Sequence, residues 1–359
     1  MNKFSAEELQ HIVGSVQPVD LSLEGQARAH LDRLTKPLGS LGRLEDLAVK
    51  MFVASGGKPP QADPARIYTI AGDHGVNEED VSYFPQEVTR QMVENFLAGG
   101  AGINVLARTS GVELIVVDAG CKGGEFPDHP GLIQRKIACG TNNISKGPAM
   151  EKGCCLRAVK LGVELADEAH AQGIKVLGTG EMGVSNTTPS TALYCAYFDL
   201  DPADITGPGG GIDAAGVVRK IGVVRRALEA NAEVVRSDDP FAILTALGGY
   251  EIAALAGLII GGAKNRQIVC IDGFISTAAY AAAAKICPAV GDYCVLSHAS
   301  AEPGYAKVIN ALGRRPLLHL DMRLGEGSGA ALSMFMLRAA ANIYNEMATY
   351  DDAGVHAGG

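Results

Sequence analysis

The chain has 359 residues, 47% of them hydrophobic, and a formal net charge of -9 at pH 7. Such a chain can bury a large core, as one α/β domain with a smaller appendage. The acidic balance argues against nucleic acid or a membrane surface as partner, because both are polyanions. No apolar run fits a signal peptide or a membrane span, so we expect a cytoplasmic protein.

The eight cysteines are scattered through apolar surroundings. They form no Cys-x-x-Cys pair and have no histidine nearby at zinc spacing. We interpret them as reduced, mostly buried side chains. We therefore predict no redox role and no bound metal.

The first sixty residues have a helical pattern. Apolar residues recur at helical spacing over 6–13, 22–34 and 44–53, which predicts three helices. The segment Lys36-Pro-Leu-Gly-Ser-Leu-Gly-Arg-Leu-Glu45 interrupts this pattern with a proline and two glycines, as is typical of a shaped turn entering a helix. Taken alone, it is interpreted as a plain connection between helices.

From Arg66 onward, short apolar runs end in glycine or aspartate and alternate with helical patterns. Five segments share this design: 67–75, 112–120, 174–181, 268–274 and 292–298. Their alternation with helices predicts a doubly wound parallel sheet, in which ligands bind beyond the carboxyl ends of the strands. The chain has neither a P-loop nor a convincing Gly-x-Gly-x-x-Gly after its first strand, so no nucleotide cofactor is predicted.

Two glycine-rich loops are candidates for binding an anion. In 178–189, Glu181 lies between glycines and precedes four hydrogen-bonding side chains, Ser185 to Thr188, which suits a phosphate or sugar at a helix start. A capped turn explains this loop equally well. The second loop, 206–213, contains four glycines, and Lys220 is placed to add positive charge, although linkers have similar compositions.

The stretch 321–330 places Glu326 between Gly325 and Gly327, directly before an apolar helix. Glycines let a ligand approach the backbone, and a helix start offers N–H groups to an anion. This combination suggests a reactive carboxylate beside a bound phosphate. On this stretch alone, a helix capped by Ser328, with Glu326 as a first-turn charge, is the simpler interpretation.

Two histidines, His74 and His298, lie at predicted strand ends, where ligands bind. A hydrolytic triad would need a Gly-x-Ser-x-Gly elbow, and the chain has none. We interpret both histidines as structural or substrate-orienting.

Six motifs together resemble one family, the nicotinate-nucleotide:dimethylbenzimidazole phosphoribosyltransferases of cobamide lower-ligand synthesis (the CobT family). They are 36–45, 72–76, 178–189, 272–274, 297–302 and 322–332, in the family's order and over nearly the whole chain. The resemblance implies a Rossmann-like α/β catalytic domain over 60–324 and a small helical domain built from 1–59 and 325–359. It also implies dimers whose active site lies near the interface.

The reaction that the resemblance implies is the displacement of nicotinate from nicotinate mononucleotide by an aromatic base, with inversion to the α-riboside. Nicotinate leaves as a neutral ring, so only the incoming base must lose a proton. Glu326 matches the catalytic base, and a desolvated carboxylate is a better base near neutral pH. Glu181 matches a second acid that stabilises the transition state or assists proton removal.

The phosphate and ribose are expected to contact helix starts, the glycine loops, one lysine and the turn after the last strand. The residues assigned to this role are Gly183, Ser185, Asn186, Thr187, Gly209, Gly210, Lys220, Ser297, Ser300 and Gly327.

The acceptor pocket departs from the family pattern at Phe84, Met92 and Met182. Members that use dimethylbenzimidazole typically have Ser, Gln and Leu there, and Phe and Met offer only packing. This change predicts phenol or p-cresol as acceptor, as in the ArsA/ArsB branch, whose members pair two similar chains. The chain is accordingly expected to form a homodimer or a heterodimer with a paralogous chain.

Three alternatives stay open at this point. The three changed positions can also line a repacked benzimidazole pocket. The chain can instead be a non-catalytic nucleotide-binding subunit, or a hydrolase that cleaves the same N-glycosidic bond with water.

Overall fold

The computed structural model describes residues 5–356 of the chain. Its centre is a parallel sheet with the strand order β3-β2-β1-β4-β5-β6. The strands are β1 (Ala65–Gly72), β2 (Glu113–Gly120), β3 (Leu132–Gln134), β4 (Val176–Met182), β5 (Ile268–Ile271) and β6 (Cys294–Leu296). The order reverses between β1 and β4, which is where sheets of this kind bind their ligands.

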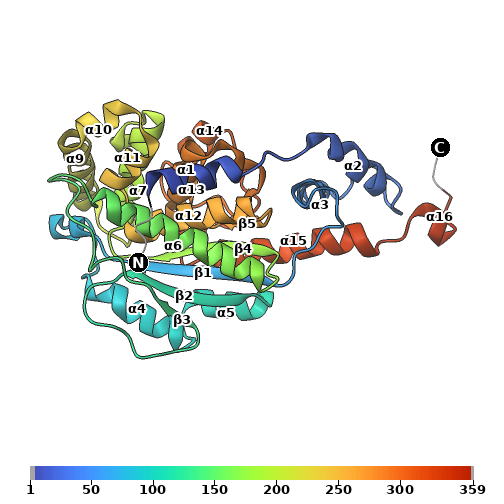
Figure 1. Cartoon of the computed structure of the whole chain (residues 1–359), viewed down its shortest axis with the longest axis horizontal. Coiled ribbons are helices and arrows are strands. Elements are labelled where there is room, and N and C mark those ends of the chain that lie inside the picture. The colour runs from blue at the N-terminus through green and yellow to red at the C-terminus, as the bar shows by residue number, and fades with distance from the viewer. Residues whose placement is uncertain (1–4, 357–359) are drawn as a thin grey trace.

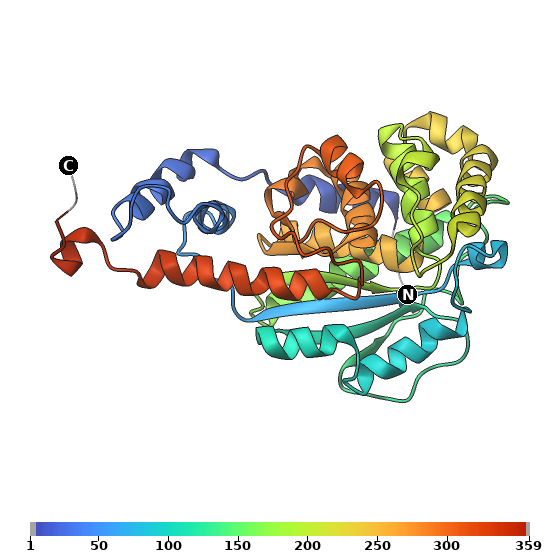
Figure 2. The ribbon, with the colours of Figure 1, turned by 180° about the vertical axis from the view of Figure 1, so that it is seen from behind.

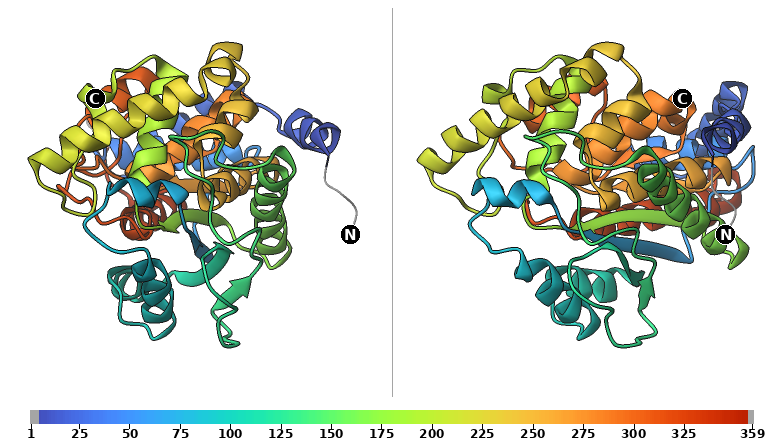
Figure 3. Two further views of the ribbon diagram at one scale, coloured as in Figure 1. Left: turned by 90° about the vertical axis from the view of Figure 1, so that its left-hand side faces the viewer. Right: turned by 60° about the vertical axis from the view of Figure 1, so that its left-hand side comes forward.

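Helices cover both faces of the sheet (Figure 1, Figure 3). On one face, α12 packs against β1, β2, β4 and β5, with α6 and α13 packed against α12. On the other face, α15 packs on β1, β4 and β5, and α4 and α5 lie over the neighbouring strands. These helices are α4 (Glu87–Leu97), α5 (Gly102–Ser110), α6 (Lys152–Ala171), α12 (Tyr250–Lys264), α13 (Phe274–Ile286) and α15 (Ser328–Glu346). The predicted Rossmann-like α/β fold is confirmed.

The contact between α6 and α12 is unusually close. A Cβ atom on Gly162 would lie 1.8 Å from the Ala254 carbonyl oxygen, and one on Gly257 would lie 2.0 Å from the Val159 carbonyl oxygen. Only glycine fits these positions, because any side chain would collide with backbone. The helix α12 is buried from Tyr250 to Ala263, as expected of a helix that is apolar on every side.

The remaining helices lie around the carboxyl edge of the sheet and at the chain ends. Around α7 (Thr187–Phe198) pack α8 (Pro202–Ile205), α9 (Ala214–Ala230), α11 (Pro240–Leu247) and α14 (Tyr305–Leu312). The short α10 (Ala232–Ser237) packs on α9 and α11. The short 3-10 helices are η1 (Leu21–Leu23), η2 (Gly75–Glu79) and η3 (Pro288–Asp292).

The two ends of the chain meet beside α15. The helices α2 (Glu24–Asp32) and α3 (Arg43–Ala54) lie along the part of α15 that extends beyond the sheet, near α16 (Tyr350–Ala353) (Figure 1, Figure 2). The Thr35 N–H donates to the Ala348 carbonyl oxygen at 3.0 Å. The first helix, α1 (Ala6–Ser15), packs on α12 and α6 instead. The division into 60–324 and 1–59 plus 325–359 stays a prediction.

Five of the six strands lie within or next to the predicted segments. The strand β3 was not predicted, because three half-buried residues at a sheet edge are too few to show a period. The third predicted N-terminal helix, 44–53, is α3, and the second, 22–34, is the short η1 followed by α2. All eight cysteines are free and six of them are buried, as predicted.

Candidate active site

A cavity of about 390 Å³ lies at the carboxyl ends of β1 and β4. Its walls come from the segments after β1, β4, β5 and β6 and from two loops that reach over them. These segments contribute residues from 81–92, 181–187, 209–210, 273–275, 298–302 and 323–326. The cavity therefore lies where the reversal of the strand order predicts a ligand site.

Most of the predicted site residues meet in this cavity. The residues that line it are Glu181, Glu326, Phe84, Met92, Met182, Gly183, Ser185, Asn186, Thr187, Gly209, Gly210 and Ser300. Three others are outside the lining: Lys220, Ser297 and Gly327. Of these, Lys220 and Ser297 are buried, and the N–H of Gly327 is hydrogen-bonded to a carboxylate.

Glu326 has a left-handed backbone conformation, with φ 65°, between Gly325 at φ 83° and Gly327 at φ 98°. A residue with a Cβ atom keeps such a conformation only where its surroundings hold it. The Glu326 carbonyl oxygen accepts a hydrogen bond from Thr69 Oγ1 at 2.7 Å. Its Oε2 atom accepts one from the Ile103 N–H, at the start of α5, at 3.0 Å. Backbone and carboxylate are thus both fixed at the cavity wall.

Two glycines of β4 make room for residues 325–327, which we call the Glu326 loop. A Cβ atom on Gly180 would lie 2.4 Å from the Glu326 carbonyl oxygen. One on Gly178 would lie 2.8 Å from the Met334 side chain in α15. Both glycines belong to the predicted anion loop 178–189, and in the structure they let the Glu326 loop and α15 lie directly on β4.

The two glutamates of the cavity have altered acidity. Burial raises the pKa of Glu181 to about 8, although the hydrogen bond from Asn186 opposes this shift. Burial also raises the pKa of Glu326. The hydrogen bond from the Ile103 N–H opposes this shift, and the negative charge of Asp272 adds to it. Both carboxyls are therefore stronger bases than a free glutamate.

The start of α15 does not offer free N–H groups to an anion, contrary to expectation. The Asp272 carboxylate, just after β5, accepts hydrogen bonds from the N–H groups of Gly327, Gly329 and Ala330 at 3.0, 2.6 and 3.1 Å. By contrast, α13 starts at the cavity without any side-chain cap, so its first N–H groups are available to an anion. The start of α7 also lines the cavity, but the Thr188 N–H donates to the Ser185 carbonyl oxygen at 2.9 Å and residue 189 is a proline without an N–H group.

A buried cation lies behind the start of α7. The Lys220 side chain, on α9, is 1% exposed and donates to Thr187 Oγ1 at 2.6 Å and to the Gly207 carbonyl oxygen at 3.2 Å. Burial lowers the pKa of Lys220 to about 8, and the nearby Glu302 carboxylate opposes this shift. An anion in the cavity would favour the charged form of this lysine.

Much of the lining is apolar. These residues are Val81, Phe84, Val88, Met92, Met182, Val184, Phe274, Ile275 and Leu324. The Phe84 ring meets Tyr83 edge-on, with centroids 5.5 Å apart, and a Cβ atom on Gly210 would lie 3.1 Å from Phe84. Leu324 directly precedes the Glu326 loop, so the carboxylate and the apolar surface share one cavity.

The sequence did not single out three further residues of this site. Arg323 and Glu302 line the cavity, and the Arg323 guanidinium donates to the Gly209 carbonyl oxygen at 3.4 Å. Asp272 caps α15. All three belong to motifs that carried the family resemblance, so their positions were the available signal.

The two histidines have different environments. His74 Nε2 lies 2.6 Å from Glu251 Oε1, and both side chains are buried away from the cavity lining. His298 lines the cavity and is 1% exposed, yet neither ring nitrogen has a hydrogen-bond partner. Its Nε2 atom lies 3.8 Å from Asp272 Oδ1. Of the two, only His298 has nitrogens left for a ligand.

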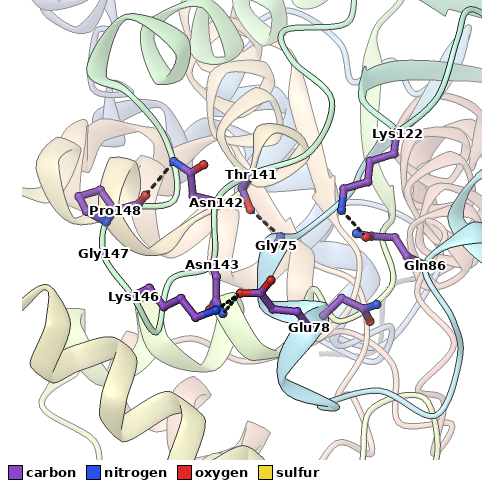
Figure 4. A pocket seen from close by; sticks show the side chains of 11 residues that line it. Gly75, Glu78, Gln86, Lys122, Thr141, Asn142, Asn143, Lys146, Gly147 and Pro148 are labelled. Atoms are coloured by element: carbon purple, nitrogen blue, oxygen red, sulfur yellow. Dashed lines mark hydrogen bonds and ion pairs between the residues drawn. The ribbon is translucent and has the colours of Figure 1, made fainter.

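A second cavity, of about 610 Å³, lies next to η2 and is lined by polar side chains such as Lys122, Gln86 and Thr141 (Figure 4). None of the predicted site residues lines it. Lys122 Nζ donates to Gln86 Oε1 at 2.6 Å, so part of this surface is already paired. The first cavity, which combines carboxylates, an apolar wall and an open helix start, is the better candidate active site.

The residues that the structure describes contain neither a metal-binding cluster nor a membrane-spanning helix. Within residues 5–356, no group of three or more His, Cys, Asp or Glu side chains is arranged to hold a metal ion. In the same part of the chain, no helix is both long and apolar enough to cross a bilayer.

Comparisons with known proteins agree with this geometry. Residues 16–355 match a family model described as phosphoribosyltransferase. A nicotinate-nucleotide–dimethylbenzimidazole phosphoribosyltransferase of Nitratidesulfovibrio vulgaris is 62% identical over 349 residues, 97% of this chain and 98% of the relative. One from Solidesulfovibrio magneticus is 60% identical over 350 residues, 98% of this chain and 99% of the relative.

A solved structure of the same kind is also similar. The crystal structure of the enzyme of that name from Thermus thermophilus has a TM-score of 0.88 and 42% sequence identity. The match covers 94% of this chain and 100% of that one.

Proposed function

The chain belongs to the nicotinate-nucleotide–dimethylbenzimidazole phosphoribosyltransferase family, and we propose that it moves the 5-phosphoribosyl group of nicotinate mononucleotide onto an aromatic base. As a member it is a phosphoribosyltransferase, a pentosyltransferase enzyme. The observation that carries the proposal is Glu326, a buried carboxylate held beside an apolar wall. The product would be an α-riboside for cobamide lower-ligand synthesis.

The reaction needs one proton acceptor. As the acceptor atom of the aromatic base forms its bond to C1′, the bond from C1′ to the pyridinium nitrogen breaks, and its electron pair returns to the nicotinate ring. The proton that the acceptor loses passes to the Glu326 carboxylate: in a benzimidazole it comes from the ring nitrogen that does not attack, and in a phenol it comes from the attacking hydroxyl. The raised pKa of Glu326 supports this role, because a base works best when its pKa approaches the working pH.

Glu181 is proposed as the second acid of the site. A bound nucleotide brings a positive pyridinium and an electron-deficient C1′, which favour the ionised form of a nearby carboxyl. Glu181 would lose its proton when the nucleotide binds and then stabilise the positive charge of the transition state. Its burial and its hydrogen bond from Asn186 support this assignment.

The phosphate is proposed to lie at the start of α7. The Ser185 to Thr187 turn supplies hydroxyls, and the buried Lys220, hydrogen-bonded to Thr187, supplies positive charge. The uncapped start of α13 adds N–H groups from the cavity wall. Gly209, Gly210 and Ser300 line the cavity and would complete this subsite. Ser297 and Gly327 would support its walls from behind, because neither lines the cavity.

The acceptor has two candidates. The names of the relatives support 5,6-dimethylbenzimidazole, the base that those enzymes are named for. The lining supports phenol or p-cresol as the second candidate, because Phe84, Met92 and Met182 offer packing and no hydrogen bonds to an imidazole edge. For the phenolic candidate, a heterodimer with a paralogous chain is the proposed assembly, and for the benzimidazole candidate a homodimer.

A competition assay tests the function and the acceptor together. The protein is incubated with nicotinate mononucleotide and equimolar dimethylbenzimidazole and phenol, and the ribotides are identified by mass spectrometry. The proposal expects an arene ribotide and one nicotinate released per ribotide. Exclusive benzimidazole product would end the phenol candidate. Nicotinate released at the same rate without any arene would instead identify a hydrolase, and no turnover would favour a non-catalytic subunit.

A further inference from the structure

One buried carboxylate, Asp272, is outside the cavity lining and has no role in the reaction as proposed above. It follows β5 directly and is fully buried. Its two oxygens accept the three N–H hydrogen bonds at the start of α15 already described. The first of these donors, Gly327, is the residue next to Glu326.

The contacts of Asp272 fix the backbone on the C-terminal side of Glu326. Thr69 Oγ1 holds the Glu326 carbonyl group, and Gly180 lets this loop lie directly on β4. A left-handed glutamate would relax to another conformation if these restraints were released, since positive φ is costly for a residue with a Cβ atom. The direction of the Glu326 side chain thus depends on a residue 54 positions earlier in the chain.

We propose that Asp272 is the positioning residue of the catalytic base, and that its carboxylate holds the start of α15 so that strained Glu326 stays aimed into the cavity. This inference rests on the proposed function, because it assumes that Glu326 accepts the proton. Asp272 touches neither substrate in this arrangement and acts through Glu326.

Its charge gives Asp272 a second effect on Glu326. The negative charge of Asp272 raises the pKa of Glu326 and also that of Glu181. Two further titratable groups face Asp272, Tyr305 and His298. Burial raises the pKa of Asp272, and His298, whose Nε2 lies 3.8 Å from Asp272 Oδ1, opposes this shift. A helix cap with a structural role alone would change stability and leave the acidity of the base unmoved.

The test is the pH profile of the variant Asp272→Asn, which keeps an oxygen for the helix start and removes the charge. With nicotinate mononucleotide and the preferred arene, we expect kcat to fall by about tenfold to a hundredfold, as for a slightly displaced catalytic group. We expect the acid limb of kcat/KM to move to lower pH, because Glu326 loses the charge that makes it more basic. KM for the nucleotide should change less than kcat.

Asp118→Asn is the matched control. Asp118 is also buried, lies at the end of β2 and accepts backbone N–H bonds from Gly120 and Cys121 at 3.1 and 2.8 Å, but it does not line the cavity or touch the Glu326 loop. Asp118→Asn should lower the stability of the protein, and the acid limb of its kcat/KM profile should lie at the same pH as in the wild type. If Asp272→Asn and Asp118→Asn have the same acid limb as the wild type, the proposal is wrong.

A second variant keeps the test decisive if Asp272→Asn does not fold. Thr69→Val removes the hydrogen bond to the Glu326 carbonyl group without touching a charge. Thr69→Val should lower kcat and leave the acid limb of the kcat/KM profile at the wild-type pH. A wild-type kcat would mean that the position of the Glu326 loop does not affect turnover, and the proposal would be wrong. Absence of any ribotide from the wild type would overturn the proposed function, which is a different outcome from wild-type behaviour of these variants.

Discussion

Two helices at the carboxyl edge of the sheet, α15 and α13, use their first N–H groups in different ways. The start of α15 is closed, because Asp272 accepts hydrogen bonds from three of its N–H groups. The start of α13 lines the cavity and has no side-chain cap. A closed start is a rigid support, whereas an open start is a site for negative charge.

This difference separates the chemistry from the binding. The closed start carries Glu326, whose backbone must keep a strained conformation. On the binding side, the open start of α13 offers N–H groups, and the buried Lys220, hydrogen-bonded to Thr187, supplies the charge that a phosphate needs. Variants that disturb the Glu326 loop should therefore change kcat, and variants of the phosphate subsite around Thr187 and Lys220 should change KM for the nucleotide.

The largest effect is expected from Glu326→Gln. The amide still accepts the Ile103 N–H hydrogen bond but no longer takes a proton, so kcat should fall by about 10²- to 10⁴-fold while KM for nicotinate mononucleotide stays similar. Steady-state kinetics at saturating arene would measure this, with a thermal melt to verify folding. A variant with near wild-type kcat would remove Glu326 from the role of base.

Gly180→Ala should have the next largest effect. Its new methyl group would lie 2.4 Å from the Glu326 carbonyl oxygen, so the Glu326 loop must move, and a displacement of about 1 Å can lower kcat about a hundredfold. Gly25→Ala is the control, because nothing lies within 4 Å of a Cβ atom there. Equal kinetics of both variants would show that the loop tolerates displacement.

Lys220→Met tests the proposed phosphate subsite. Loss of a charged partner of the phosphate should raise KM for nicotinate mononucleotide by about 10- to 100-fold, from the roughly 1.5 to 3 kcal/mol of a charged hydrogen bond. The value of kcat should change less than in Glu326→Gln. Arg225→Met, on the same helix but exposed and paired with Asp201, should leave KM unchanged. If Lys220→Met lowered kcat and left KM unchanged, Lys220 would belong to the chemical step and would not bind the phosphate.

The smallest effect is on stability and comes from Glu181→Gln. The folded-state pKa of Glu181, about 8, lies above its ordinary value of 4.5, so the ionised form disfavours folding. Stability contributed by the protonated form is full below about pH 4.5 and is lost as the pH rises through about 8. The variant should match the wild type near pH 4 and exceed its Tm by about 1 to 2 °C at pH 9 for each kcal/mol relieved, because the unfolding entropy of a chain of this length is large. Thermal melts at both pH values would measure it, and an equal Tm at pH 9 would contradict the raised pKa.

Much of the fold and of the site could be predicted from local patterns. The apolar runs that end in glycine or aspartate identified β1, β2, β4, β5 and β6, because a buried strand and the loop after it leave a contiguous signal. Glu181 and Glu326 stood out because each is flanked by glycines. Their common cavity followed from the rule that ligands bind beyond the carboxyl ends of parallel strands.

The rest depended on contacts between residues far apart in the chain. Glu326 is held by Thr69 and Ile103, which are 257 and 223 positions away, and no sequence period reports such pairs. The cap of α15 comes from Asp272, so the helix looked open when its own sequence was considered alone. For the same reason, Gly180 was interpreted only as part of the predicted anion loop 178–189. Its contact with the Glu326 carbonyl group joins residues far apart in the chain.

The residues that hold Glu326 come from β1, α5 and the end of β5, so only a segment that spans most of the chain, from Thr69 to Gly327, contains them all. Proton acceptance by this side chain is consequently a property of the completed tertiary structure. Enzymatic activity should disappear together with the global unfolding transition in denaturant, and a refolding chain should regain it only in the last cooperative step. Turnover is then a sensitive reporter of complete folding for this protein.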